Sequence, residues 1–398
     1  MTRLLIPDVR GLPRAFWLLF AAAVVDRLGG FGIVYLSIWL AGPDAPVGLT
    51  VASAGLAVSL FSLGGLVGGP VGGALADRFG RKPVLVGALL GTAAAWLLLS
   101  QMHSLVTIAA TTLLVGACSN LGRPAMAAAI ADVVPEEHRR RAFGLHYWAI
   151  NLGFAFSAAL AGGLARFGPE LVLGLDAATS VLAALLLFVA MRELPRAAAE
   201  RPGGGPSFAA LLSGPLRDGL MVLLVLVGLM NAAMFHQASV VLAAEMRADG
   251  LDGQYGPLLA LNGVLIVLMQ PSLTQVTERW RASWVLASGC LLVGGGFFLT
   301  VFADQAAGHA LAIGVWTLGE ILLASTMPTV INRLAPETMR ASYQGLYGLS
   351  WSVSAFAPAL GAWTVQQGGA PLLWSTCLGL GLLGAALVLR LGRSPRMA

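Results

Sequence analysis

Long runs of hydrophobic residues recur along the whole chain, and charged residues gather in the short segments between them. A helix needs about 20 apolar residues to cross a bilayer. Runs of that length predict spans at 15–40, 49–74, 83–102, 105–131, 143–166, 169–191, 218–243, 255–276, 283–302, 307–332, 342–367 and 370–391. The pattern predicts an all-α membrane protein with twelve transmembrane helices.

Composition agrees with this prediction. The chain is 57% hydrophobic and 11% charged, whereas soluble domains carry about 25% charged residues. A chain this apolar cannot cover a water-exposed surface, so we expect lipid to surround much of it. The net charge of +5 therefore does not indicate a nucleic-acid partner.

Basic residues lie almost entirely on one side of the predicted spans. The two tails and the loops that follow every second span hold twenty of the 24 lysines and arginines. Such loops face the cytoplasm in multi-pass proteins. We expect an inner (cell) membrane protein with both termini in the cytoplasm.

A stretch rich in proline and glycine divides the chain near its midpoint. Residues 193–217 have the composition of a linker. We expect a six-helix bundle at 1–192, a cytoplasmic linker at 193–217 and a second six-helix bundle at 218–398.

The two predicted bundles also repeat each other at an offset of 201 residues. Matched pairs include Pro70 with Pro271, Asp77 with Glu278, Arg78 with Arg279, Pro135 with Pro336 and Arg139 with Arg340. Six spans per repeat keep both copies in the same orientation, which predicts a substrate site between them.

The second predicted span carries two glycine series, each with a spacing of four residues. One series is Gly64, Gly68 and Gly72, and the other is Gly65, Gly69 and Gly73. Each series lines one helix face and lets another helix approach closely. We expect these faces to serve static packing or a surface that slides during transport.

This span leads into a loop with a specific signature, Gly73-Ala74-Leu75-Ala76-Asp77-Arg78-Phe79-Gly80-Arg81-Lys82. The stretch resembles the signature of the major facilitator superfamily, in which the aspartate helps to hold the outward-facing state. The resemblance implies two pseudo-symmetric six-helix bundles. A helix N-terminus attracts an anion, so we expect Asp77 to meet the start of the eleventh span near Ser342. Basic partners are expected from 139–141.

The loop at 135–144 resembles the same family's link between its fourth and fifth helices, and the nearest resemblance is to drug/proton antiporters. An antiporter marker in the fifth helix is only partly present, because Ser157-Ala158 replaces its glycine-proline pair. For conformational gating we expect Gly73, Asp77, Arg78, Gly80, Arg81, Lys82, Glu136, Arg139, Glu278, Arg279 and Arg340.

Among the charged residues inside predicted spans, four have no charged counterpart in the repeat. An ionisable group at the centre of a membrane helix costs at least ~2.5–3.5 kcal/mol and usually marks a pathway or proton relay. We expect Asp26 and Glu320 to couple transport to protons, and Arg27 and Arg123 to bind substrate. The alternative is a structural role, with Asp26 paired to Arg123 and Glu320 bonded to a neighbouring helix.

Other polar and aromatic side chains could line a central amphipathic pocket, although such residues also serve helix packing. The candidates for substrate binding are Tyr35, Trp148, Asn151, His236, Gln237, Asn262 and Trp351. Asp26-Arg27 and Phe31 also resemble the first-helix signature of proton-coupled peptide symporters.

Enzymatic chemistry is not expected. Lys82 is the one lysine and follows Arg81, whereas a Walker A loop requires glycine-lysine followed by serine or threonine. The three cysteines fit neither a disulfide framework nor a zinc site, and we expect no cofactor. The sequence predicts a monomeric secondary transporter that exports hydrophobic or amphipathic molecules in exchange for protons. Import of a small metabolite or peptide together with protons is the alternative.

Overall fold

The computed structural model describes residues 11–30, 32, 51–164, 167–190, 207–248 and 250–396, and these residues form helices and turns without a strand. The N-terminal bundle contains α1 (Arg14–Leu28), α3 (Val51–Phe79), α4 (Arg81–Leu99), α5 (Leu105–Val133), η1 (Glu136–His138), α6 (Arg139–Leu164) and α7 (Pro169–Ala190). The C-terminal bundle contains α9 (Gly219–Ala248), α10 (Asp252–Thr277), α11 (Ala282–Leu299), η4 (Thr300–Phe302), α12 (Ala306–Leu334), η5 (Glu337–Met339), α13 (Arg340–Ser354) and α14 (Ala357–Leu391).

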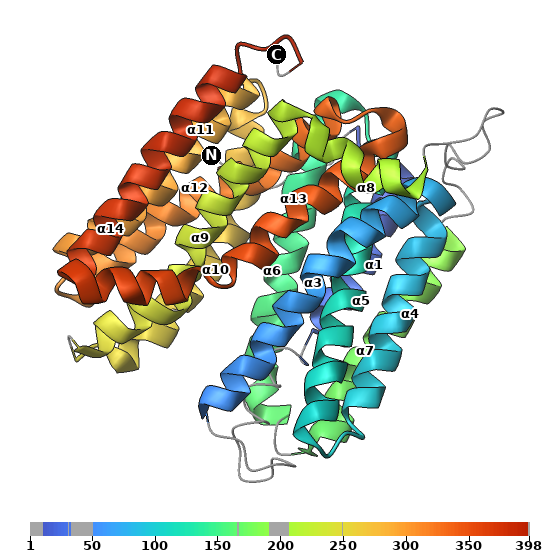
Figure 1. Ribbon diagram of the computed structural model, residues 1–398, viewed down its shortest axis with the longest axis horizontal. Helices are drawn as coiled ribbons and strands as arrows, with labels where there is room; N and C mark the ends of the chain where they lie inside the picture. The colour runs from blue at the N-terminus through green and yellow to red at the C-terminus, as the bar shows by residue number, and fades with distance from the viewer. Residues whose placement is uncertain are drawn as a thin grey trace.

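The helices form the two predicted bundles of an all-α membrane fold. Within the described residues, nine helices are long and apolar enough to cross a bilayer. In Figure 1 the two bundles meet near the upper end and separate toward the lower end. Contact between them runs mainly through α3 with α13 and through α6 with α10 and α12. The end that carries the α3–α4 turn, η1 and η5 is called the closed end below.

The first predicted span is not one continuous helix. We expected a helix over 15–40, but α1 ends at Leu28 and a turn follows at Gly29 and Gly30. Two adjacent glycines favour this ending because glycine has high backbone freedom and weak helix propensity. The helix therefore ends one residue after the Asp26-Arg27 pair. Residues 31 and 33–50 lie outside the described residues.

The last two predicted spans are divided differently from our expectation. The span at 342–367 breaks between α13 and α14, where Pro358 follows the break. Proline fits the first turn of a helix but not its interior. Within the range of α14, helical geometry is interrupted at Gly369. Its φ of 75° is a conformation that glycine adopts readily. The twelfth span therefore begins after this glycine, as the sequence predicts.

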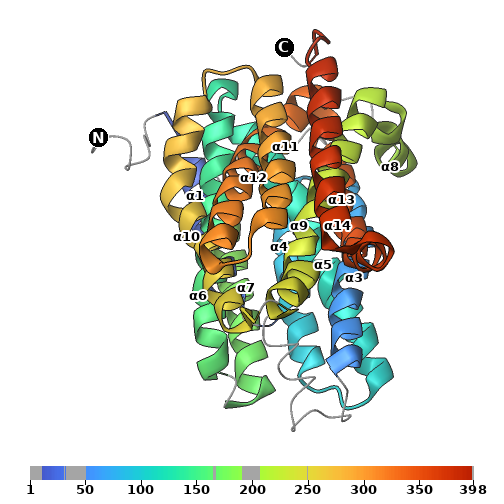
Figure 2. The same ribbon diagram turned by 90° about the vertical axis from the view of Figure 1, so that its left-hand side faces the viewer.

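A short helix lies inside the predicted linker. α8 (Phe208–Arg217) begins at Ser207, whose side chain accepts a hydrogen bond from the backbone N–H of Ala210. Its buried face carries Leu211 and Pro215. Figure 2 shows α8 at the upper end, beside the closed-end segments. The exact limits of the linker remain a prediction, because 191–206 lie outside the described residues.

The two glycine faces of α3 have different partners. A Cβ on Gly68 would lie 2.2 Å from the carbonyl oxygen of Ala117 on α5, so this face packs within the N-terminal bundle. A Cβ on Gly73 would lie 2.4 Å from the carbonyl oxygen of Ala341, and Gly345 approaches Gly69 in the same way. One face thus serves static packing, and the other forms the contact between the bundles.

Candidate functional site

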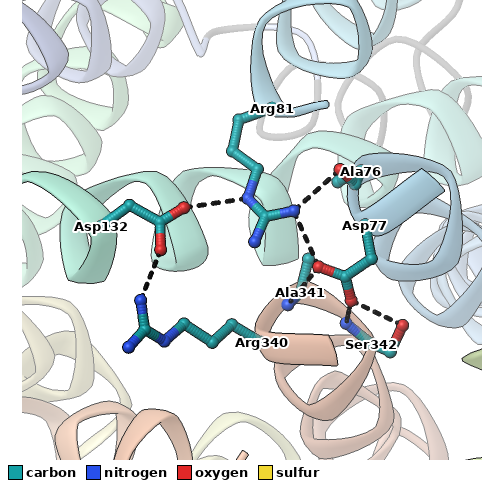
Figure 3. A network of polar contacts seen from close by, with 7 residues as sticks. All are labelled: Ala76, Asp77, Arg81, Asp132, Arg340, Ala341 and Ser342. Atoms are coloured by element: carbon teal, nitrogen blue, oxygen red, sulfur yellow. Dashed lines mark hydrogen bonds and ion pairs between the residues drawn. The ribbon is translucent and has the colours of Figure 1, made fainter. Parts of the chain in front are cut away.

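The charged network at the closed end centres on Asp77. Its carboxylate accepts hydrogen bonds from the backbone N–H groups of Ala341 (3.2 Å) and Ser342 (2.7 Å) and from the Ser342 hydroxyl (2.7 Å). These groups form the N-terminus of α13 (Figure 3). The predicted meeting of Asp77 with this helix start is therefore present. An anion here is stabilised by both the free N–H groups and the helix dipole.

The basic partner of Asp77 differs from our expectation. Arg81, four residues further on, donates to Asp77 at 2.8 Å and to the Ala76 carbonyl at 2.8 Å. We expected partners from 139–141, and that was wrong. The tight turn at Gly80, with φ of 98°, brings the start of α4 back over the end of α3. Local geometry therefore places Arg81 closer to Asp77 than the distant loop.

Asp132 extends this network to the other bundle, and sequence reasoning missed it. It accepts hydrogen bonds from Arg81 at 3.1 Å and from Arg340 of η5–α13 at 2.7 Å (Figure 3). Arg340 was an expected gating residue. A signal for Asp132 was present in the sequence, since an acid stood at the loop end of the fourth predicted span.

A second set of contacts joins α6 to α10 at the same end. Arg141 pairs with Glu278 at 2.7 Å. Arg140 donates to the carbonyl oxygens of Thr277 and Trp280, where α10 ends. A basic group at a helix C-terminus satisfies free carbonyls and complements the helix dipole. The two related contacts between the bundles therefore use opposite charges. In one, the acid Asp77 meets the start of α13, and in the other, Arg140 meets the end of α10.

The remaining gating candidates are divided. Glu136 pairs with Arg333 across the bundles at 2.7 Å, whereas Arg139 donates to the nearby Val134 carbonyl at 3.2 Å. Within the described residues, three candidates make no hydrogen bond or ion pair between the bundles: Arg78 stacks on Phe79, Lys82 donates to the Phe188 carbonyl, and Arg279 is exposed.

The polar C-terminal tail also docks at the closed end. Arg396 pairs with Asp218, at 2.6 Å, and donates to the Leu334 carbonyl at 3.1 Å. Burial raises the pKa of Asp218, but the hydrogen bonds from Arg396 and Tyr343 outweigh it, so this pKa lies below its ordinary value. The contact joins the start of α9 to the end of the chain.

Glu320 lies at the centre of the contact between the bundles. It is buried at mid-length of α12, and its two carboxylate oxygens have separate donors. The Tyr147 hydroxyl of α6 donates to Oε1, and the Asn262 amide of α10 donates to Oε2 at 2.9 Å. Asn262 also donates to Thr317 Oγ1 at 2.9 Å. Tyr147 was not predicted, although it stands directly before the predicted Trp148.

The acid and arginines of the N-terminal bundle form a separate cluster. Asp26 pairs with its neighbour Arg27 at 2.9 Å and accepts a longer bond from Ser180 at 3.4 Å. The alternative pair of Asp26 with Arg123 is not formed as an ion pair. Arg123 nevertheless lies close enough to both Asp26 and Arg27 for electrostatic interaction. Its side chain is exposed although it stands within α5.

The other predicted site residues have varied positions. Trp148 donates to the Val267 carbonyl on α10 at 2.9 Å, so its polar group joins the bundles. Asn151 donates to the Tyr147 carbonyl at 3.0 Å. Gln237 donates to the Ala357 carbonyl at 3.0 Å and packs against α14 rather than the centre. Tyr35 lies outside the described residues.

An aromatic group beside Glu320 includes the last two candidates. Trp351 is 39% exposed and contacts Phe235 and His236, with ring centroids 5.6 and 6.1 Å apart. Phe235 in turn meets Trp316, which precedes Glu320 by one helical turn. Apolar ring surface therefore adjoins the buried acid.

Comparison with known proteins decides the family. Residues 19–357 match the family model described as Major Facilitator Superfamily. The chain belongs to the major facilitator superfamily.

Relatives and solved structures agree with this assignment. The chain is 28% identical over 319 residues to a "Na(+), Li(+), K(+)/H(+) antiporter" of Planococcus maritimus, covering 71% of this chain and 74% of the relative. It is 26% identical over 348 residues to the "Multidrug resistance protein MdtH" of Aeromonas salmonicida, covering 85% of each. The fold matches a bacterial homologue of the iron transporter ferroportin in its outward-facing state, with a TM-score of 0.80, 14% identity and 96% and 100% coverage. Membership of this superfamily means that the chain is a membrane transporter.

Proposed function

We propose that this chain is a proton-coupled antiporter that exports amphipathic small molecules by alternating access. The observation that carries the proposal is the position of Glu320. It is a buried acid in a membrane helix, and one of its two hydrogen-bond partners, Tyr147, belongs to the opposite bundle. Intramembrane acids are typical of proton relays and substrate pathways.

Protonation of Glu320 would act directly on the contact between the bundles. An ionised carboxylate accepts strong hydrogen bonds from Tyr147 and Asn262, and hydrogen bonds to a charged group contribute about 1.5–3 kcal/mol each. A neutral carboxyl group accepts more weakly. Protonation thus weakens the hydrogen bond between Tyr147 of α6 and Glu320 of α12, and this couples proton binding to movement of the bundles.

The orientation follows from the distribution of basic residues. With most of them in the cytoplasm, the closed end faces the cytoplasm and the structure represents an outward-facing state. The contacts of Asp77, Asp132 and Glu278 then hold the cytoplasmic side shut. We further propose a monomer in the cell membrane, with both termini in the cytoplasm and no enzymatic activity.

The names of two relatives support antiport. One relative is named as a cation/proton antiporter and another as a multidrug resistance protein. Proton-coupled import is the second candidate, because Asp26 and Arg27 form an ion pair beside the interruption of α1. Transporter sites of this kind often lie at interrupted helices.

Reconstituted vesicles distinguish the two candidates. Uptake of a panel of amphipathic amines, acids and neutral compounds would be measured with the interior made acidic or the exterior made acidic. Antiport predicts accumulation driven by the acidic interior, since protons leave as substrate enters. Accumulation driven only by an acidic exterior would establish symport, and accumulation that ignores both gradients would refute proton coupling.

A further inference from the structure

We propose that the central site binds zwitterions, with the cationic group of the ligand at Glu320 and its anionic group at Arg27 and Arg123. The inference rests on the proposed function, because it assigns a substrate class to the same site. The two bundles carry opposite charge toward each other at mid-membrane. A ligand with one charge of each sign would neutralise both.

The N-terminal bundle holds an arginine that no direct ion pair neutralises. Arg27 is paired with Asp26, and its side chain remains 33% exposed. Arg123 makes no hydrogen bond or ion pair with any described residue. Only one of these two guanidinium groups therefore has an ion-pair partner among the described residues, in a region where an uncompensated charge is costly. A further acid of this bundle, Asp176 of α7, accepts a hydrogen bond from the Gly32 N–H at 2.9 Å and makes no ion pair within the described residues.

Arg123 stands on the helix face that meets the other bundle. Asn120, three residues earlier on α5, lies against Gly65, and a Cβ on Gly65 would also lie 2.8 Å from Ser352 Oγ of α13. Residues three apart share a helix face, so Arg123 faces the same side. His146 adds a further polar atom: its Nδ1 is buried without a hydrogen bond, and the ring lies close to both arginines.

The C-terminal bundle offers the complementary charge. Glu320 is the acid at mid-membrane among its described residues, and Tyr147 is the partner that the other bundle supplies. When the bundles separate, a ligand ammonium group can take the place of the Tyr147 hydroxyl. The exposed ring of Trp351, beside Phe235, provides an apolar surface for the body of the ligand.

One turn of α6 brings the two charged regions within reach of a single small molecule. His146 faces the arginines, and the next residue, Tyr147, reaches Glu320. Consecutive residues of a helix are about 1.5 Å apart along its axis, so the two regions lie at nearly the same depth. Protonation of Glu320 would then release the cationic end alone, as antiport requires.

Three dansyl compounds with the same five-carbon chain test the proposal: Nε-dansyl-lysine, dansylcadaverine and dansyl-6-aminohexanoate. They are a zwitterion, an amine and an acid, and binding to the purified full chain in nanodiscs is read from dansyl fluorescence. We expect the zwitterion to bind at least about tenfold more tightly than either relative, which corresponds to ~1.4 kcal/mol. Equal binding of all three, tightest binding of a singly charged compound, or no binding of the zwitterion would overturn the proposal.

Variants assign the two ends of the ligand. Arg123→Gln and Arg27→Gln should each reduce zwitterion affinity toward that of dansylcadaverine, and thermal unfolding of each variant reports whether it is correctly folded. Glu320→Gln should reduce zwitterion affinity toward that of the acid. The matched control is Arg393→Gln, at an exposed arginine beyond α14 whose guanidinium makes no hydrogen bond or ion pair with described residues. If Arg123→Gln leaves the zwitterion preference intact, the anionic subsite is wrong. Proton-driven uptake of dansylcadaverine that depends on Glu320 would still support the proposed function in that case.

Discussion

Replacing Asp77 with asparagine tests how the closed end is held. Asparagine keeps the size of the side chain and removes its charge. Asp77 accepts bonds from two backbone N–H groups at the start of α13, from the Ser342 hydroxyl and from Arg81, and its side chain is fully buried. Asp77→Asn therefore changes one charge and leaves the packing of α3 in place.

The expected magnitude follows from these contacts. A hydrogen bond to a charged group contributes about 1.5–3 kcal/mol, and an anion at a helix N-terminus contributes about 0.3–2 kcal/mol. An amide oxygen can still accept the two bonds from Ser342. Of the two bonds that are lost, only the one from the Ala341 N–H joins the bundles, since Arg81 belongs to the same bundle as Asp77. We therefore take the loss of one charge-assisted bond together with the dipole interaction. The closed end is then destabilised by about 3 kcal/mol, and the ratio of its open to closed states rises about 100-fold.

Distances between spin labels measure this change. Glu137 and Arg279 are exposed on opposite bundles at the closed end and suit labelling after substitution by cysteine. The native cysteines, Cys118, Cys290 and Cys377, are first replaced by alanine. We expect one short distance for the parent protein and a longer, well-populated component for Asp77→Asn. The matched control is Asp304→Asn, an exposed aspartate in the turn between α11 and α12. An unchanged distance distribution in Asp77→Asn would refute the role assigned to these bonds.

Two further predictions concern the same end. Gly73→Ala places a methyl group 2.4 Å from the carbonyl oxygen of Ala341, so the same spin-label pair should show a longer distance. The control is Gly379→Ala, at a glycine with open space around its Cβ. Equal distances in both variants would contradict the close approach. Arg141 and Glu278 are largely buried and 2.7 Å apart. A double-mutant cycle with Arg141→Gln and Glu278→Gln should therefore give a coupling free energy of about 1 kcal/mol or more, measured by thermal unfolding of the detergent-solubilised protein. Additive effects of the two substitutions would contradict a direct pair.

The sequence was sufficient to predict the fold, because long apolar runs and the 201-residue repeat dictate two similar helical bundles. It also predicted the contact of Asp77 with the start of α13, since a signature acid and a helix N-terminus attract each other. Interruptions inside spans were not predicted. The turn after Leu28 depends on two glycines, which hydropathy alone does not distinguish from other small residues.

Contacts between distant side chains were the part that the sequence could not provide. Tyr147 and Glu320 are 173 residues apart, and their contact depends on how α6 packs against α12. Arg140 belonged to the segment expected to pair with Asp77, but its partners are backbone carbonyls, which leave no mark in the sequence. Gln237 was assigned to the centre because it is polar, yet its partner is the start of α14. Polarity in the sequence thus indicated which buried residues need a hydrogen-bond partner. The identity of the partner depends on how the helices pack, which the sequence did not reveal.

Transport by the Glu320→Gln variant is the most direct test of the central claim. The variant and the parent protein would be reconstituted in vesicles, and uptake of a transported amphipathic compound would be followed with and without an imposed pH gradient. We predict that Glu320→Gln still exchanges the compound when no gradient is present but no longer accumulates it when the interior is acidic. Accumulation equal to that of the parent protein would contradict the assignment of Glu320 as the proton-carrying group.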